Sequence, residues 1–123
     1  MKRNPVGWFE IYVQDMSRAK AFYETVLGST LSPLGPQELQ MEAFPADMTS
    51  PGTGGALVKF DGMPSGGNSV LVYFNCDDCG LEGSRVGGAG GQVVRDKMSI
   101  GDYGFVVLAT DTEGNMFGLH SMV

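Results

Sequence analysis

The alternation of apolar and polar residues predicts a chain of short strands interrupted by two helices. Residues 8–13 (WFEIYV) alternate aromatic or polar side chains with aliphatic ones, as in a strand whose two faces differ. A helix is expected over 18–27, with Ser17 as its N-cap and Gly28 directly after its last residue. Pro- and Gly-rich turns separate the short strands that follow. These are expected near 30–34, 38–44 and 55–60.

The second half of the chain repeats this order of elements. A strand is expected over 69–76, followed by an acidic turn at Asp77 and Asp78 and by a weaker helix over about 80–89. Three further strands are expected near 92–95, 104–110 and 115–121. A shift of 63 residues aligns the halves: Val13 falls on Cys76, Asp15 on Asp78, Gly28 on Gly91 and Leu31 on Val94.

This repetition predicts an α+β fold of two βαβββ modules, spanning about 5–62 and about 67–122 of a single domain of 123 residues. Each predicted sheet has one face covered by its helix, so the other face must be buried or must line something. We expect the two modules to form a curled mixed sheet around a central cavity, where small-molecule sites usually form.

Composition and charge narrow the class of protein. Hydrophobic residues make up 42% of the chain and charged residues 18%, which is typical of a globular domain. The net charge is −6 and the eight Lys and Arg residues are scattered, so neither nucleic acid nor an anionic membrane is expected as a partner. No apolar run exceeds five residues, far short of a membrane span. The sequence therefore predicts a soluble, cytoplasmic protein.

Two cysteines form a C-x-x-C motif, Cys76 to Cys79. A redox role needs a stabilised thiolate, and the two intervening aspartates oppose one. A zinc site needs four ligands, and His120 is the single histidine that could join the pair. We expect ordinary reduced thiols, as is usual for cytosolic cysteines.

Two segments resemble a known family. Residues 13–28 (V-Q-D-M-S-R-A-K-A-F-Y-E-T-V-L-G) resemble the first-helix signature of vicinal oxygen chelate proteins, the glyoxalase/bleomycin-resistance superfamily. Residues 111–119 (D-T-E-G-N-M-F-G-L) resemble the hairpin that closes the second half in that family, and the turn at 89–93 (A-G-G-Q-V) fits between them. The resemblance covers about the whole chain and implies the same paired βαβββ modules.

The resemblance also implies four metal-binding positions, one on the first and one on the last strand of each module. In this sequence they fall on Trp8, Lys59, Leu71 and Gly118. An indole, an alkyl chain and a glycine cannot coordinate a metal, and a lysine is cationic at neutral pH. We therefore expect neither a metal nor another cofactor.

The same positions point into the cavity in this family, so the strand period of two predicts which residues line it. On the first strand of each module these are Trp8, Glu10 and Tyr12, and Leu71, Tyr73 and Asn75. Gly118 and His120 share a face of the last strand, and the missing side chain of Gly118 is expected to leave room for a ligand beside Trp8. The candidate catalytic residues are Glu10 and His120. The candidate ligand-binding residues are Trp8, Tyr12, Lys59, Tyr73 and Asn75.

Glu10 has two interpretations. A carboxylate between aromatic residues in a partly dry cavity suits a general acid or base. Alternatively, it forms an internal ion pair with Lys59 or His120.

Three functions compete. The first is a metal-free binder of a hydrophobic or aromatic small molecule, similar to the drug-sequestering members of the family. The second is a glyoxalase-like lyase or isomerase acting on a small carbonyl compound, with Tyr12, Tyr73 or His120 polarising the substrate beside Glu10. The third is an accessory protein whose cavity is filled by side chains. Losing the metal removes a Lewis acid, which favours binding over catalysis. Family analogy further predicts a homodimer.

Overall fold

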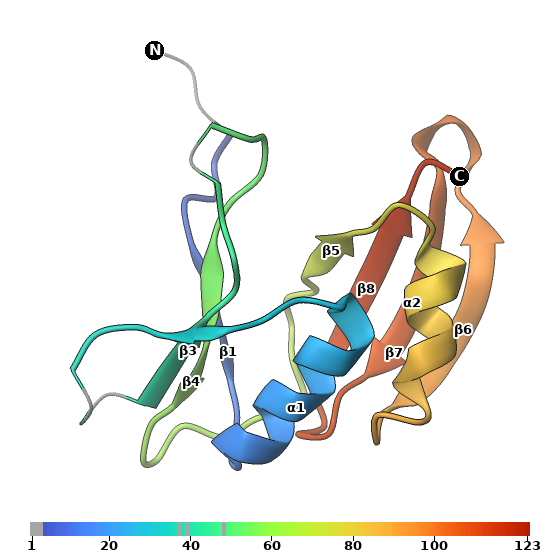
Figure 1. The fold of residues 1–123 in the computed structure, drawn as a ribbon. Coiled ribbons are helices and arrows are strands. Elements are labelled where there is room, and N and C mark those ends of the chain that lie inside the picture. The colour runs from blue at the N-terminus through green and yellow to red at the C-terminus, as the bar shows by residue number, and fades with distance from the viewer. Residues whose placement is uncertain (1–3, 37, 39, 48) are drawn as a thin grey trace.

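The computed structural model describes residues 4–36, 38, 40–47 and 49–123, and it shows the predicted α+β fold (Figure 1). Two βαβββ modules follow one another along the chain. The first contains β1 (Phe9–Tyr12), α1 (Met16–Leu27), β2 (Ser32–Pro33), β3 (Gln40–Ala43) and β4 (Gly55–Lys59). The second contains β5 (Tyr73–Asn75), α2 (Cys79–Val86), β6 (Gln92–Ser99), the 3-10 helix η1 (Gly101–Tyr103), β7 (Phe105–Thr110) and β8 (Met116–Ser121).

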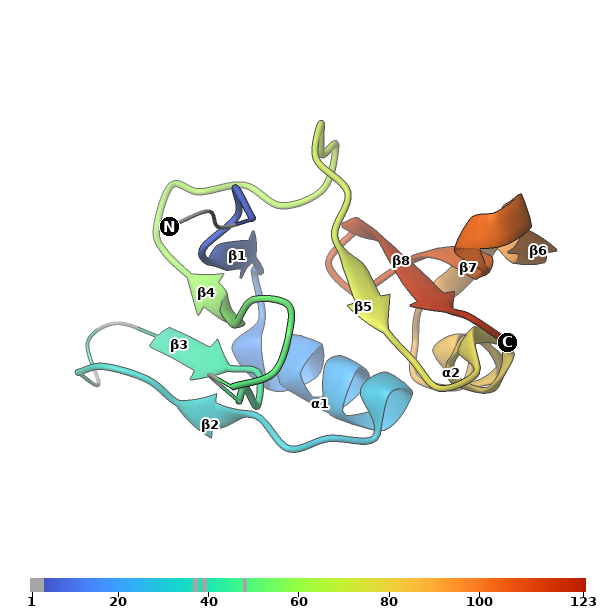
Figure 2. The ribbon, with the colours of Figure 1, turned by 90° about the horizontal axis from the view of Figure 1, so that it is seen from above.

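Both modules have the same sheet topology. The strand orders are β1-β4-β3-β2 and β5-β8-β7-β6, and the first strand of each module is parallel to its last. The described strands form two separate four-stranded sheets and do not close into a barrel. Seen from above, the sheets meet at an angle, α1 lies in the corner between them, and α2 covers the second sheet (Figure 2).

Several element boundaries differ from the predicted ones. α1 begins at Met16, because the side chain of Asp15, not Ser17, caps it by accepting from Arg18 N at 3.0 Å. It ends at Leu27 as predicted, and the next residue, Gly28, caps it with φ of 66°. α2 begins at Cys79 and ends at Val86, earlier than predicted at both ends.

The predicted strand over 69–76 is reduced to the three residues of β5. The side chain of Asn68 explains its late start, because it donates to Val70 O at 2.7 Å and to Met116 O at 2.9 Å. These bonds hold the preceding segment as a turn. Conversely, β6 continues to Ser99, four residues beyond its predicted end at 95.

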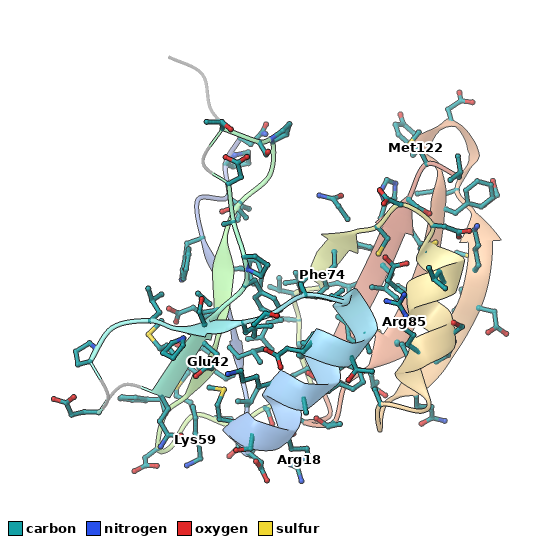
Figure 3. The ribbon with its side chains drawn as sticks, in the orientation of Figure 1. Arg18, Glu42, Lys59, Phe74, Arg85 and Met122 are labelled. Carbon is teal, nitrogen blue, oxygen red and sulfur yellow. The ribbon has the colours of Figure 1, made fainter. Side chains whose placement is uncertain are left out.

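One aromatic core joins the two modules. Ring centroids lie 5.0–6.0 Å apart in a connected cluster, and every pair is tilted or edge-to-face. Its members are Phe9, Phe22, Tyr23, Phe44, Phe74 and Phe117. Phe74, on β5, lies between the two sheets and beside α1 (Figure 3). The modules are thus held together on the faces that carry the helices.

Each sheet consequently has an inner face, which packs on this core, and an open face, which carries no helix. On β1, Ile11 belongs to the core while Glu10 is exposed; on β8, Leu119 belongs to the core and His120 faces the other way. Among the described residues, neither helix has the length and apolar character needed to cross a bilayer.

Candidate functional site

The open face of the first sheet carries Trp8, Glu10 and Tyr12, as the period of two predicts. Glu10 accepts hydrogen bonds from Trp8 Nε1 at 3.2 Å and from the Tyr12 hydroxyl at 2.8 Å. The bond to Glu10, with partial burial and the negative charge of Glu10, raises the pKa of Tyr12. Glu10 is exposed rather than enclosed, and its partners lie on its own strand. The predicted ion pair with Lys59 or His120 is therefore wrong.

Lys59 does not join these residues. It lies in register with Gln40, two residues after the core residue Leu57, so its side chain is on the inner face. Lys59 and Arg18 lie at the same end of the molecule (Figure 3). The residues that β4 contributes to the open face are Ala56 and Val58, which lie in register with Glu10 and Tyr12.

The open face of the second sheet brings three candidate residues together. Tyr73 is in register with Gly118, and Asn75 with His120, across the parallel pair of β5 and β8. The side chains of Tyr73, Asn75 and His120, with four aliphatic ones, line a cavity of about 460 Å³. The lining residues are Tyr73, Asn75, Met98, Ile100, Val106, Leu108 and His120.

The space above Gly118 is not free for a ligand. The ring of Tyr73 lies over Gly118 so closely that a Cβ atom there would overlap the ring. Trp8, beside which a ligand was expected, lies directly before β1 of the other sheet. The predicted opening is therefore replaced by an aromatic wall of the cavity.

His120 is anchored at the edge of this cavity. Its Nε2 atom lies 2.6 Å from the carbonyl oxygen of Tyr103, in the turn between β6 and β7. This turn is itself closed by hydrogen bonds from Ile100 N to Gly104 O at 2.8 Å and from Gly104 N to Gly101 O at 3.2 Å. The imidazole is thus oriented by a backbone group in a tight turn.

Five of the seven candidate residues line two cavities of one chain. Glu10 and Tyr12 line a cavity of about 200 Å³ between β1 and the segment that leads into β5. Asn75, His120 and Tyr73 line the larger apolar cavity on the second sheet. Asn75 also lines a third cavity, of about 760 Å³, together with residues of the first module. The structure therefore does not bring Glu10 and His120 together within one cavity of the described chain.

The residues present do not fit the metal of the resemblance. None of Trp8, Leu71 and Gly118 supplies a ligand, and Lys59 is on the inner face. Among the described residues, no group of three or more His, Cys, Asp or Glu side chains could hold a metal ion. On the open faces, Glu10 and His120 already have hydrogen-bond partners and lie in different cavities.

The two cysteines are free. Burial and the neighbouring carboxylate of Glu82 raise the pKa of the Cys76 thiol to about 12, so it stays protonated at neutral pH. Cys79 is buried at the start of α2. This geometry agrees with the prediction of unreactive, reduced thiols.

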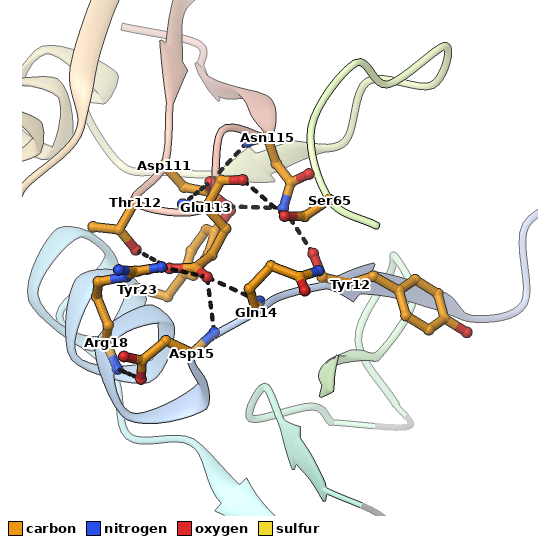
Figure 4. Close-up of polar contacts among 10 residues, drawn as sticks. All are labelled: Tyr12, Gln14, Asp15, Arg18, Tyr23, Ser65, Asp111, Thr112, Glu113 and Asn115. Atoms are coloured by element: carbon orange, nitrogen blue, oxygen red, sulfur yellow. Dashed lines mark hydrogen bonds and ion pairs between the residues drawn. The ribbon is translucent and has the colours of Figure 1, made fainter. Parts of the chain in front are cut away.

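Sequence reasoning missed a buried carboxylate at the junction of the modules (Figure 4). Glu113 accepts from the backbone N–H groups of Gln14 and Asp15, both at 2.9 Å, and from Arg18 Nε at 2.7 Å. Burial raises the pKa of Glu113, but these bonds and one from Thr112 outweigh burial and lower it to about 2. The turn motif that contains Glu113 was the available signal, although nothing in the sequence located its partners.

Beside it, the buried carboxylate of Asp111 accepts a hydrogen bond from the Tyr23 hydroxyl at 2.6 Å. It also accepts from the backbone N–H groups of Glu113 and Asn115, both at 2.8 Å. Asn115 in turn donates to Tyr12 O at 3.0 Å. These polar groups fix the closing turn of the second module against the first and are structural.

The sequence model of the Glyoxalase/Bleomycin resistance protein/Dioxygenase superfamily matches residues 6–119. The chain belongs to this superfamily, in agreement with its paired βαβββ modules.

Individual relatives are more distant. The chain is 29% identical over 116 residues to "Putative glyoxylase CFP32" of Mycobacterium tuberculosis, a match that covers 91% of this chain and 42% of that protein. The chain therefore spans less than half the length of this curated relative.

Solved structures share the fold. TnmS3, an antibiotic binding protein from Streptomyces sp. CB03234, is 25% identical with a TM-score of 0.71, and the match covers 98% of each chain. A glyoxalase-related enzyme from Fulvimarina pelagi is 15% identical with a TM-score of 0.74, covering 97% of this chain and 88% of that one. The second similarity shows the fold alone.

Proposed function

We propose that this protein binds a hydrophobic or aromatic small molecule on the open face of its second sheet, without a metal. The observation that carries the proposal is the cavity of about 460 Å³, lined mainly by Met98, Ile100, Val106 and Leu108. Its volume lies within the range of roughly 300–1,000 Å³ found for ligand pockets. An accessory protein with a filled cavity would show side chains closing this space.

Two further observations support binding over chemistry. The positions that hold the family's metal carry no ligand side chains, so the Lewis acid that would stabilise a transition state has no site there. The similar TnmS3 is described as an antibiotic binding protein, and it matches this chain over almost its full length.

The proposal includes a homodimer in which the open faces cover one another. Large apolar side chains are exposed on both open faces, including Trp8 at 44% on the first and Tyr73 at 48% on the second. The two faces belong to separate sheets that meet at an angle (Figure 2). The cavity of about 460 Å³ is lined by residues of the second module alone. In a two-fold dimer, the first sheet of one copy would cover the second sheet of the other. Light scattering at working concentration should give twice the chain mass; a monomer mass would contradict this part.

We place the protein in the cytoplasm in this proposal. Its two cysteines are free and Cys76 is held as a thiol, which suits a reducing compartment.

The test of binding uses a matched pair of charge insertions. Met98→Glu places a carboxylate in the cavity, whereas Leu81→Glu places one on an exposed apolar position of α2. A panel of polycyclic aromatic ligands is screened by thermal shift against the wild type, and the affinity of each hit is measured for both variants. Met98 is 37% exposed, so the inserted carboxylate loses water only when a ligand covers it. We expect roughly tenfold weaker binding by Met98→Glu, which corresponds to about 1.4 kcal/mol. Equal affinities for all three proteins would overturn the cavity as the site.

A glyoxalase-like lyase or isomerase is the second candidate, favoured by the similarity to "Putative glyoxylase CFP32". In this reading Glu10 acts as acid or base, because its carboxylate is exposed beside the hydroxyl of Tyr12. Wild type and Glu10→Gln are compared for turnover of a panel of small carbonyl compounds. Turnover by the wild type that is lost in Glu10→Gln would establish this function; no turnover by either protein rules out the role of Glu10.

A further inference from the structure

The polar end of the large cavity has a defined hydrogen-bonding character. His120 lies on β8, between β5 and β7, in register with Asn75 on one side and Val106 on the other. The imidazole and the Asn75 amide therefore stand together at one end of a cavity whose remaining lining is aliphatic apart from Tyr73.

The contact with Tyr103 decides which ring nitrogen of His120 carries the proton. A carbonyl oxygen only accepts hydrogen bonds, so the Nε2 atom, 2.6 Å away, must be the donor. In a neutral imidazole the other nitrogen is then an acceptor. Within the described part of the chain, the hydrogen bonds of the His120 ring include this contact alone. Nδ1 therefore keeps a lone pair for a ligand.

The carbonyl that imposes this tautomer is held in place before any ligand arrives. Gly104 has φ of 104°, a conformation that favours glycine, and a Cβ atom there would overlap Ser121 O. The turn at 100–104 consequently fixes the direction of the Tyr103 carbonyl. The Nδ1 atom of His120 is then a fixed acceptor in a mainly apolar cavity. It discriminates strongly between ligands, because a ligand without a donor leaves this polar atom desolvated and without a partner.

We infer that the cavity selects planar aromatic molecules bearing a hydroxyl or N–H donor, which bonds to Nδ1 of His120 while the ring packs against Tyr73 and the aliphatic wall. This inference rests on the proposed binding function and adds the chemical class of the ligand. The charged side chains of the described residues do not line this cavity, so a neutral donor such as a phenol or an aromatic amine suits it best.

A pair of probes tests the requirement for a donor. 2-Naphthol carries an O–H group, and 2-methoxynaphthalene has the same rings and oxygen without the donor. Affinities are measured by fluorescence titration for wild type and for His120→Phe, which keeps a ring and removes the acceptor. We expect wild type to bind 2-naphthol about fivefold more tightly than the ether, the effect of one net hydrogen bond. His120→Phe should lose this preference, because its affinity for 2-naphthol should fall while its affinity for the ether stays unchanged.

The possible outcomes distinguish a failure of the donor requirement from a failure of the proposed binding function. Equal binding of both probes by wild type, or a preference that persists in His120→Phe, overturns the donor requirement and leaves the apolar binding function standing. Binding of neither probe by wild type overturns both.

A measurement on the unmodified protein guards against misfolding of the variant. The chain has one histidine, so its ring nitrogens give a single set of ¹⁵N NMR signals. We expect the signals of an Nε2–H tautomer, and the Nδ1 signal should shift on addition of 2-naphthol but not of the ether. An Nδ1–H tautomer, or equal shifts with both probes, would contradict the inference.

Discussion

Both modules lay an aromatic ring over a glycine of the neighbouring parallel strand, but they do so on opposite faces. In the first module the ring of Phe9 lies over Gly55, and in the second the ring of Tyr73 lies over Gly118. Phe9 enters the core, with its ring centroid 5.7 Å from that of Phe44. Tyr73 is 48% exposed and forms a wall of the cavity.

The difference teaches how one arrangement can serve stability in one module and binding in the other. The shift of 63 residues that aligns the modules places Glu10, not Phe9, on Tyr73. The aromatic residue has therefore moved by one position between the repeats. Because side chains alternate across a strand, one position is enough to move the ring from the inner to the open face.

Truncating the two rings should give the largest contrast. Phe9→Ala removes a core ring and should lower the free energy of unfolding by about 3 kcal/mol. Tyr73→Ala removes an exposed ring and should lower it by less than about 1 kcal/mol, while weakening ligand binding. Urea unfolding of both variants measures the difference. Equal losses of stability in the two variants would show that the open-face ring supports the fold as much as the inner-face ring does.

The buried carboxylate between β7 and β8 and the exposed carboxylate on β1 should also differ in their effect on stability. Glu113→Gln leaves Arg18 and two backbone donors with weaker or missing acceptors at a buried site, which should cost about 2–3 kcal/mol. Glu10→Gln changes an exposed group bonded to its own strand neighbours and should leave stability nearly unchanged. A large loss in Glu10→Gln would mean that the open face also maintains the fold.

Acid should act through the buried carboxylate at the junction of the modules. The pKa of Glu113 is about 2 in the folded protein against an ordinary value of 4.5, so the folded state binds this proton less readily. Its contribution is complete above pH 4.5 and is lost as the pH falls through 2, an effect of roughly 3 kcal/mol. Unfolding titrations between these pH values should show a steep loss in wild type and a shallower one in Glu113→Gln. Parallel profiles would assign the acid sensitivity to other groups.

Adding one methyl group under each ring is the finest test. Gly55→Ala forces Phe9 against its core neighbours and should cost about 2 kcal/mol. Gly118→Ala moves Tyr73 toward solvent and the cavity, so it should cost less stability but weaken ligand binding. Thermal unfolding measures the loss of stability, and titration with a ligand found in the thermal-shift screen measures the loss of affinity. A stable Gly55→Ala variant would show that the first ring is not confined.

Local signals predicted much of this architecture. The alternation over 8–13, the glycine at the end of α1 and the acidic turn before each helix were enough to predict two βαβββ modules. Those features depend on residues adjacent in the chain, whose conformational preferences are readable without tertiary contacts. The face of the sheet on which Lys59 lies could not be predicted in this way, because an error of one position reverses the face of a strand residue.

The cavity was only partly predictable. Asn75, Tyr73 and His120 were found from strand alternation together with the family's inward-facing positions, and the structure places them together. Met98 and Ile100 were missed because β6 continues past its predicted end through two register shifts against β7. Such irregularities depend on the partner strand and on the turn at 100–104, which a single-strand pattern does not contain. The angle between the sheets likewise follows from the shared aromatic core.

The shared strand order also has a consequence for biosynthesis. β1 pairs with β4 and β5 with β8, so the first strand of each module stays unpaired while the whole intervening segment is translated. Phe74 lies on β5, and its contact with Phe117 cannot form until β8 emerges. Closing such long loops is slow compared with forming a hairpin. A nascent chain therefore exposes an apolar strand edge for most of the synthesis of each module, an opening for chaperones and for misassembly between the two similar repeats.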